Sequence, residues 1–103
     1  MTIAIAADST DPQGLVSRHA ARAAYYLIYD NNGDLLKAIE NPGAQVERGA
    51  GPTAALFLQQ QGVSTIIAAE FGSRFTTELE AEQITASQAN GTIATAIHTI
   101  TNQ

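Results

Sequence analysis

The stretch PTAALFLQQQGVSTIIAA, residues 52–69, contains a helix and a strand joined at a glycine. Pro52 suits the first turn of a helix, because a backbone N–H has no intrahelical partner there. Good helix formers follow from 53 to 61, and Gly62 is a typical helix end. The continuous apolar run 63–69 is typical of a parallel strand that is covered on both faces. A helix that leads into such a strand predicts an α/β fold.

Three strands are expected before this unit. The apolar run 3–7 predicts a short buried strand, and the aromatic and branched residues of 24–30 predict a second. Asn32 and Gly33 form a strong hairpin signal between apolar runs. Residues 35–40 are therefore expected to pair with the second strand in antiparallel fashion. The intervening stretch 13–22 has no clear period and is expected to form a loop.

The remaining elements complete the expected architecture. They are a helix over about 73–82, a strand over 84–88 and a helix that starts near residues 90–92. The order is therefore βββαβαβα, and crossovers through helices make the later strands parallel. This is the order of a ribonuclease H-like three-layer α/β domain with a mixed five-stranded sheet.

The composition limits the functions open to this chain. Its 103 residues suffice for one compact domain, expected to span 1–103. A net charge of -5 argues against a nucleic-acid partner, since binding one requires a basic face. Cysteine is absent, so neither disulfides nor thiolate-bound metals are expected. The start does not resemble a signal peptide and no apolar run suits a membrane helix, so we expect a cytoplasmic protein without a membrane partner.

The basic residues gather at one edge of the expected sheet. This is the edge where the first and fourth strands end, and ligands bind there in open α/β sheets. All four arginines fall in the loops at this edge or at the first turn of a helix: Arg18, Arg22, Arg48 and Arg74. In a chain of net charge -5, this placement predicts an anion site. Local ion pairing with acidic residues of the same loops, such as Asp8, Glu47 and Glu70, is the alternative.

Two helix N-termini are expected at the same edge. Gly49 and Gly51 lie at the start of one helix, and Gly72 precedes the other. The N–H groups of a helix start attract anions, and glycine lets a ligand approach the backbone closely. These three glycines are therefore candidates for cradling a ligand. A turn that merely starts a helix is the alternative for Gly49 and Gly51.

Several stretches, in their order and spacing, resemble one known family. They are IAIAADS (3–9), VSRHAARA (16–23), YYLIYD (25–30), GAGPTAALFLQQQGVSTIIAAEFG (49–72) and GTIATAI (91–97). Together they cover nearly the whole chain, which resembles the dinitrogenase iron–molybdenum cofactor biosynthesis family of small, cofactor-carrier-like domains.

The resemblance implies a ribonuclease H-like fold and a role as a non-catalytic carrier. Its cargo would be an anionic iron–sulfur or iron–molybdenum cofactor, or a precursor, and its partners would be cofactor-assembly proteins. The family motif Ser-x-His-Phe-Gly-x-Ala matches 17–23, with Ala20 and Ala21 in the places of Phe and Gly. The matching His19 is then the implied direct metal ligand, with the four arginines balancing the cluster charge.

His19 has two interpretations from its chemistry. Stable metal sites normally use three or four protein ligands, so a lone histidine is a weak site by itself. A preassembled cluster brings its own sulfides, and for it one histidine and a few arginines suffice. The alternative is a loop histidine that is hydrogen-bonded to the backbone. His98 lies off the isoleucine stripe of the last helix and is expected to be exposed.

Two other functions are consistent with the same sequence. The first is a small regulatory or ligand-binding module of this fold that binds no cluster. The second is a divalent-metal nuclease that uses Asp8 and Glu70, which stand at the ends of the first and fourth strands. The acidic surface lacks the basic track that a nucleic-acid substrate requires.

Overall fold

The computed structural model describes residues 2–102. The elements along the chain are β1 (Ile3–Ala7), β2 (Tyr25–Tyr29), β3 (Leu35–Glu40), the 3-10 helix η1 (Pro42–Ala44), α1 (Ala50–Gln60), β4 (Thr65–Ala68), α2 (Ser73–Ala81), β5 (Thr85–Gln88) and α3 (Ile93–Thr101). The expected βββαβαβα order is confirmed, with η1 as an addition. Among residues 2–102, no helix has the length and apolar character needed to cross a bilayer.

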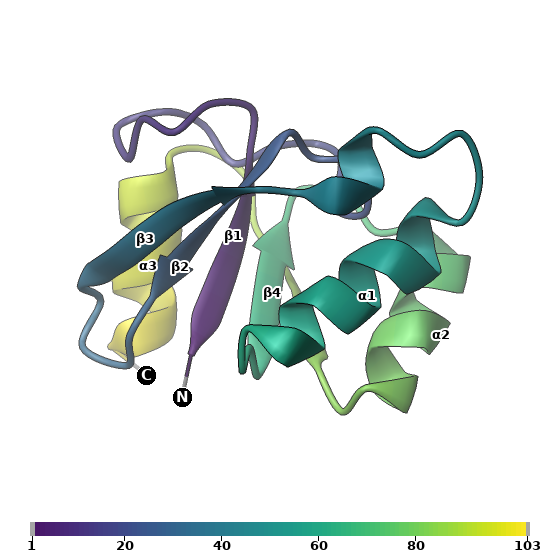
Figure 1. The fold of residues 1–103 in the computed structure, drawn as a ribbon. Coiled ribbons are helices and arrows are strands. Elements are labelled where there is room, and N and C mark those ends of the chain that lie inside the picture. The colour runs from purple at the N-terminus through teal and green to yellow at the C-terminus, as the bar shows by residue number, and fades with distance from the viewer. Residues whose placement is uncertain (1, 103) are drawn as a thin grey trace.

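The five strands form one mixed sheet in the order β3-β2-β1-β4-β5 (Figure 1). β1 lies at the centre, antiparallel to β2 and parallel to β4. Its register places Ile5 between Leu27 on one side and Ile67 on the other. Every residue of β1 is buried, as its apolar sequence predicts. The mixed sheet is thus confirmed, and ribonuclease H-like stays our interpretation of its order.

Helices cover both faces of the sheet, which gives three layers (Figure 1). Successive side chains of a strand point to opposite faces. Ala4 and Ala6 accordingly pack in the core beneath α1 and α2, whereas Ile3 and Ile5 pack in the core beneath α3. Burying an isoleucine side chain contributes about 1.5–3 kcal/mol, so Ile3 and Ile5 help to hold α3 against the sheet.

Some boundaries differ from the expected ones. α1 starts at Ala50, so Pro52 lies at its third position, still within the first turn where its missing N–H costs nothing. β4 covers only the middle of the expected 63–69 strand. η1 has no counterpart in the expected order of elements; Asn41 caps it by accepting a hydrogen bond from the Gly43 N–H at 2.8 Å.

The loop expected over 13–22 is confirmed, and main-chain bonds attach it to the sheet. Isolated bridges join Val16 to Ala7 and Leu15 to Thr92. The Ser17 N–H donates to the Ala6 carbonyl at 2.8 Å, and the Ser17 carbonyl accepts from the Ala69 N–H at 2.9 Å. The loop is therefore fixed across the carboxyl ends of β1 and β4.

Candidate functional site

A cleft of about 840 Å³ opens at this edge of the sheet, where β1 and β4 end. Its walls come from the 18–22 loop, the start of α1, and the β4–α2 loop with the first half of α2. Seven of the eight expected site residues line it: Arg18, His19, Arg22, Gly49, Gly51, Gly72 and Arg74. Arg48 is exposed but is not among the lining residues.

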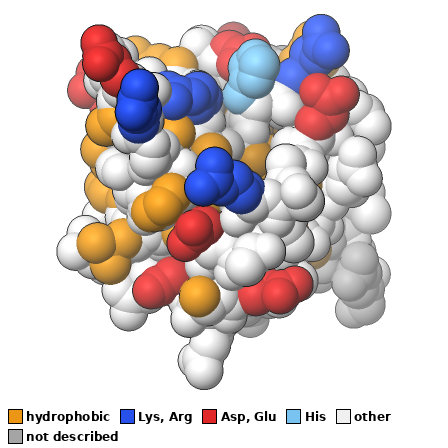
Figure 2. Space-filling model, turned by 90° about the vertical axis from the view of Figure 1, so that its right-hand side faces the viewer, with side chains coloured by type: hydrophobic (Ala, Val, Ile, Leu, Met, Phe, Trp, Pro, Cys, Tyr) orange, Lys and Arg blue, Asp and Glu red, His pale blue; other side chains and the backbone are white. Residues whose placement is uncertain are grey.

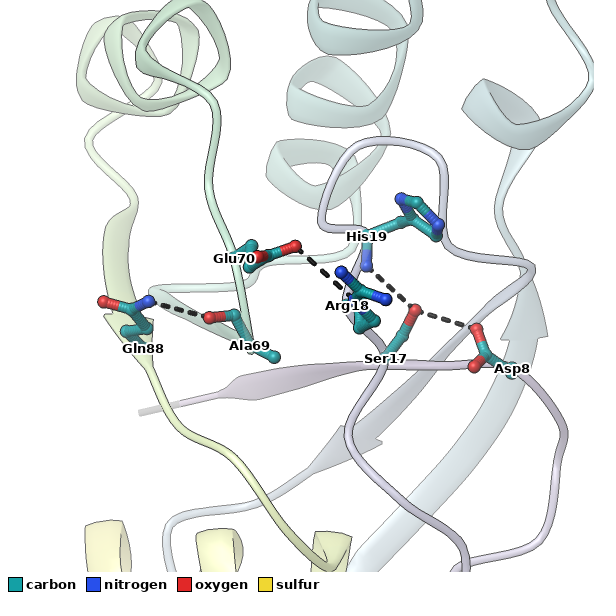
Figure 3. Close-up of polar contacts among 7 residues, drawn as sticks. All are labelled: Asp8, Ser17, Arg18, His19, Ala69, Glu70 and Gln88. Atoms are coloured by element: carbon teal, nitrogen blue, oxygen red, sulfur yellow. Dashed lines mark hydrogen bonds and ion pairs between the residues drawn. The ribbon is translucent and has the colours of Figure 1, made fainter.

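Ser17 fixes the backbone from which His19 projects. Its side chain is fully buried, and its hydroxyl donates to Asp8 Oδ1 at 2.8 Å while accepting from the His19 N–H at 3.1 Å (Figure 3). The imidazole itself is exposed and points away from this pair. Within residues 2–102, the His19 ring makes no hydrogen bond to the backbone, so the alternative interpretation of this histidine has no support here. The ring is free to meet a ligand.

Tyr26 and Asn41 fix the other end of the 17–23 loop, which we call the histidine loop. The Tyr26 hydroxyl donates to the Ala20 carbonyl at 2.6 Å. The Asn41 amide donates to the carbonyls of Ala21 and Ala23, each at 2.8 Å. Burial raises the pKa of the Tyr26 hydroxyl, so this group stays protonated and keeps donating. The 17–23 loop is thus a preorganised wall of the cleft.

The arginines differ in what they already bind. The Arg22 guanidinium donates to the carbonyls of Val46 at 2.6 Å and Glu47 at 3.1 Å, so it holds the loop that leads into α1. Arg18 forms an ion pair with Glu70, with Nε and Oε2 3.7 Å apart. Within the described part of the chain, the Arg74 side chain has neither an ion pair nor a hydrogen bond. Local ion pairing therefore accounts for one of the four arginines.

The two helices that start at the cleft lack side-chain caps. Gly49 precedes α1 and Gly72 precedes α2, and neither has a side chain that could accept from the first-turn N–H groups. In contrast, Thr92 caps α3 by accepting from the Thr95 N–H at 3.2 Å. The first-turn N–H groups of α1 and α2 have no intrahelical partners. Their positive helix ends are therefore open to an anion in the cleft.

Figure 2 shows the charge on this side of the molecule. Basic side chains and a histidine gather in the upper half of the view, with acidic side chains among them. Three arginines and two glutamates, Glu70 and Glu78, line the cleft, which leaves one net positive charge from these side chains. The cleft is thus basic only locally, in a protein of net charge -5.

The donor set does not form a metal site by itself. Among residues 2–102, no three His, Asp or Glu side chains gather closely enough to hold a metal ion. Asp8 is bonded to Ser17 and Glu70 is paired with Arg18, so the two carboxylates of the nuclease alternative are engaged separately. With no cysteine in the chain, His19 is the nitrogen ligand among the residues that line the cleft. These residues fit a metal–sulfide group that arrives assembled.

Sequence reasoning missed the aromatic wall of the cleft. Phe71 and Phe75 both line it, with ring centroids 6.4 Å apart and planes inclined by 16°. Phe75 is buried and belongs to the core beneath α2 as well as to the cleft wall. Phe71 lies next to Gly72, between the end of β4 and the start of α2. This position at the carboxyl end of a strand is the feature of the sequence that could have placed Phe71 at the ligand site.

The fold and the cleft define a small three-layer α/β domain with an anion-suited pocket at the strand ends. The chain belongs to the dinitrogenase iron–molybdenum cofactor family, whose model matches residues 1–103. A search among curated proteins found no match.

Two solved structures show the likeness in three dimensions. The apo form of the orange protein from Desulfovibrio gigas is similar with a TM-score of 0.90 and 25% identity, over 98% of this chain and 87% of that one. A NifB-type protein of the DUF35 family from Thermotoga has a TM-score of 0.81 and 30% identity, with the same coverage of 98% and 87%.

Proposed function

We propose that this protein is a non-catalytic carrier that binds an anionic metal–sulfur cofactor, or its precursor, in the cleft. One observation carries the proposal. Two helix N-termini without side-chain caps open on this cleft, together with the side chains of Arg74 and His19, which have no partner among residues 2–102. Membership of the family supports a cargo of the iron–molybdenum cofactor type.

The chemistry of these groups suits a preassembled anion. Backbone N–H groups and a guanidinium stabilise negative charge without forming covalent bonds. Imidazole is a suitable ligand for iron, and a single metal–nitrogen bond is easily exchanged for one from an acceptor protein. A site with one exchangeable ligand therefore favours transfer over permanent storage. We expect cofactor-assembly proteins to deliver and accept the cargo.

The residues beneath the cleft would preorganise it for this task. Ser17, Tyr26 and Asn41 fix the histidine loop before any ligand arrives. A preorganised site loses less conformational freedom on binding, which raises affinity. Arg22 would mainly hold the 46–49 segment in place through its two hydrogen bonds to that segment, and would contribute less by contacting the cargo directly.

Anaerobic incubation with a cluster donor tests the proposal. Wild-type protein should gain a visible charge-transfer band that persists through desalting, together with stoichiometric metal. His19→Ala should lose most of this band, whereas the matched control His98→Ala, which changes an exposed histidine on α3, should keep it. A folded wild-type protein that takes up no colour would refute the carrier function and favour a regulatory module without a cluster.

A further inference from the structure

An ion pair spans two walls of the cleft. Arg18 comes from the histidine loop and Glu70 from the β4–α2 loop, and their side chains extend toward each other (Figure 3). Arg18 Nε lies 3.7 Å from Glu70 Oε2, and both residues line the cleft. The two side chains are 79% and 64% exposed, so the pair contributes little to the stability of the fold. Because both side chains line the cleft, we expect the pair to affect the affinity for a ligand that binds there.

The main chain on either side of the pair is fixed. The Ser17 carbonyl, one residue before Arg18, accepts from the N–H of Ala69, one residue before Glu70, at 2.9 Å. The Ala69 carbonyl in turn accepts from the Gln88 amide at 2.8 Å (Figure 3). The two charged side chains thus leave from backbones that are directly hydrogen-bonded. Only side-chain rotation is needed to separate or restore the pair.

We infer that Glu70 is an internal competitor that occupies Arg18 until an anionic ligand displaces it. This inference rests on the proposed function of the cleft. Arg22 is already committed to two backbone carbonyls, so Arg18 and Arg74 are the cleft arginines left to balance a ligand's charge. Glu70 neutralises one of these two.

The competition sets a threshold for binding. A weakly charged anion gains too little from Arg18 to displace a carboxylate that is tethered beside it. A more highly charged anion gains more from the same guanidinium and also repels Glu70 more strongly. Glu70 is thus a specificity-determining residue that favours ligands of higher charge, and its return to Arg18 assists release.

Titration with tetrathiomolybdate, a coloured molybdenum–sulfide dianion, tests the inference. We expect Glu70→Gln to bind this probe about two- to fivefold more tightly than wild type, the range set by exposed ion pairs. The matched control Glu80→Gln removes the same charge from the exposed end of α2, outside the cleft lining, and should change affinity by less than the cleft variant.

A double-mutant cycle with Arg18→Gln separates competition from simple charge removal. If Glu70 acts by occupying Arg18, Glu70→Gln gives little gain in the Arg18→Gln background. An equal gain in both backgrounds, or a gain no larger than that of Glu80→Gln, would overturn the inference while leaving the carrier function intact. If the wild-type protein and every variant fail to bind the probe, the proposed function is refuted and the inference falls with it.

Discussion

Gly43 lies between two walls of the cleft, the 17–23 loop and the start of α1, and its replacement by alanine should disturb both. A Cβ at this position would lie 2.9 Å from the Ala21 carbonyl oxygen, 3.0 Å from that of Ala50 and 3.1 Å from Asn41 Oδ1. Two of these atoms are backbone, and Asn41 is held by hydrogen bonds of its own. None of the three can simply rotate away, so η1 must shift against the histidine loop or against α1.

Overpacking of this kind costs about 1–3 kcal/mol. At roughly 4 °C per kcal/mol for a domain of this size, Gly43→Ala should lower Tm by about 8 °C at the middle of that range. Thermal and urea unfolding measure the change. Because the shift moves the wall that carries Ala21, the affinity for tetrathiomolybdate should also fall at temperatures where the variant is folded.

Gly72→Ala is the matched control, because a Cβ there has no neighbour within 4 Å and its φ is -73. We expect its stability to stay within about 0.5 kcal/mol of wild type. If Gly43→Ala is no less stable than Gly72→Ala, then η1 does not connect the two walls as described, and the reasoning is refuted.

Three further variants test separate parts of the structure. Tyr26→Phe leaves the Ala20 carbonyl without its donor and should cost about 1–3 kcal/mol near neutral pH. In wild type, burial holds the Tyr26 pKa above the ordinary value of about 10. The unfolded chain therefore releases this proton first as pH rises, so stability should decline above about pH 10, and the Phe variant should show less of this decline in urea titrations. Arg22→Lys keeps the charge but loses the fork to two carbonyls, so ¹⁵N relaxation should show a more mobile 46–49 segment in this variant, as in Arg22→Gln. Wild-type relaxation in the Lys variant would assign Arg22 to charge balance instead. Thr92→Ala removes the cap of α3 and should cost about 1 kcal/mol in unfolding experiments without weakening tetrathiomolybdate binding; a loss of binding would mean that α3 and the cleft are coupled.

Most of the architecture could be predicted from the sequence, because the local signals in each segment favour the same element that the structure contains. The apolar run of β1, the Asn-Gly hairpin and the glycine after α1 each have one favoured structure. η1 was not predicted because its conformation depends on tertiary packing as well as on the Asn41 cap. Gly43 packs against the carbonyl oxygens of Ala21, which is distant in sequence, and of Ala50, which belongs to the next helix. Pro42 and Gly43 by themselves favour only the end of the preceding strand, because proline cannot extend a strand ladder.

The candidate site was predictable in position and less so in detail. Topology alone brings the arginine-bearing loops to one edge, since strand direction fixes where each loop lies. What each guanidinium binds depends on tertiary distances. Arg22 reaches carbonyls more than twenty residues away, and Arg18 finds Glu70 because β1 and β4 are neighbours in the sheet. Arg48 precedes the left-handed turn at Gly49 and lies outside the lining.

The location of the bound anion is the most direct test of the central claim. Amide chemical shifts of ¹⁵N-labelled protein, followed while tetrathiomolybdate is added, report which N–H groups meet the ligand. We expect the largest changes at the first turns of α1 and α2 and at His19, with little change in β3 and α3. Changes centred on β3 or α3, or none at a probe concentration that saturates binding, would contradict the assignment of this cleft as the cofactor site.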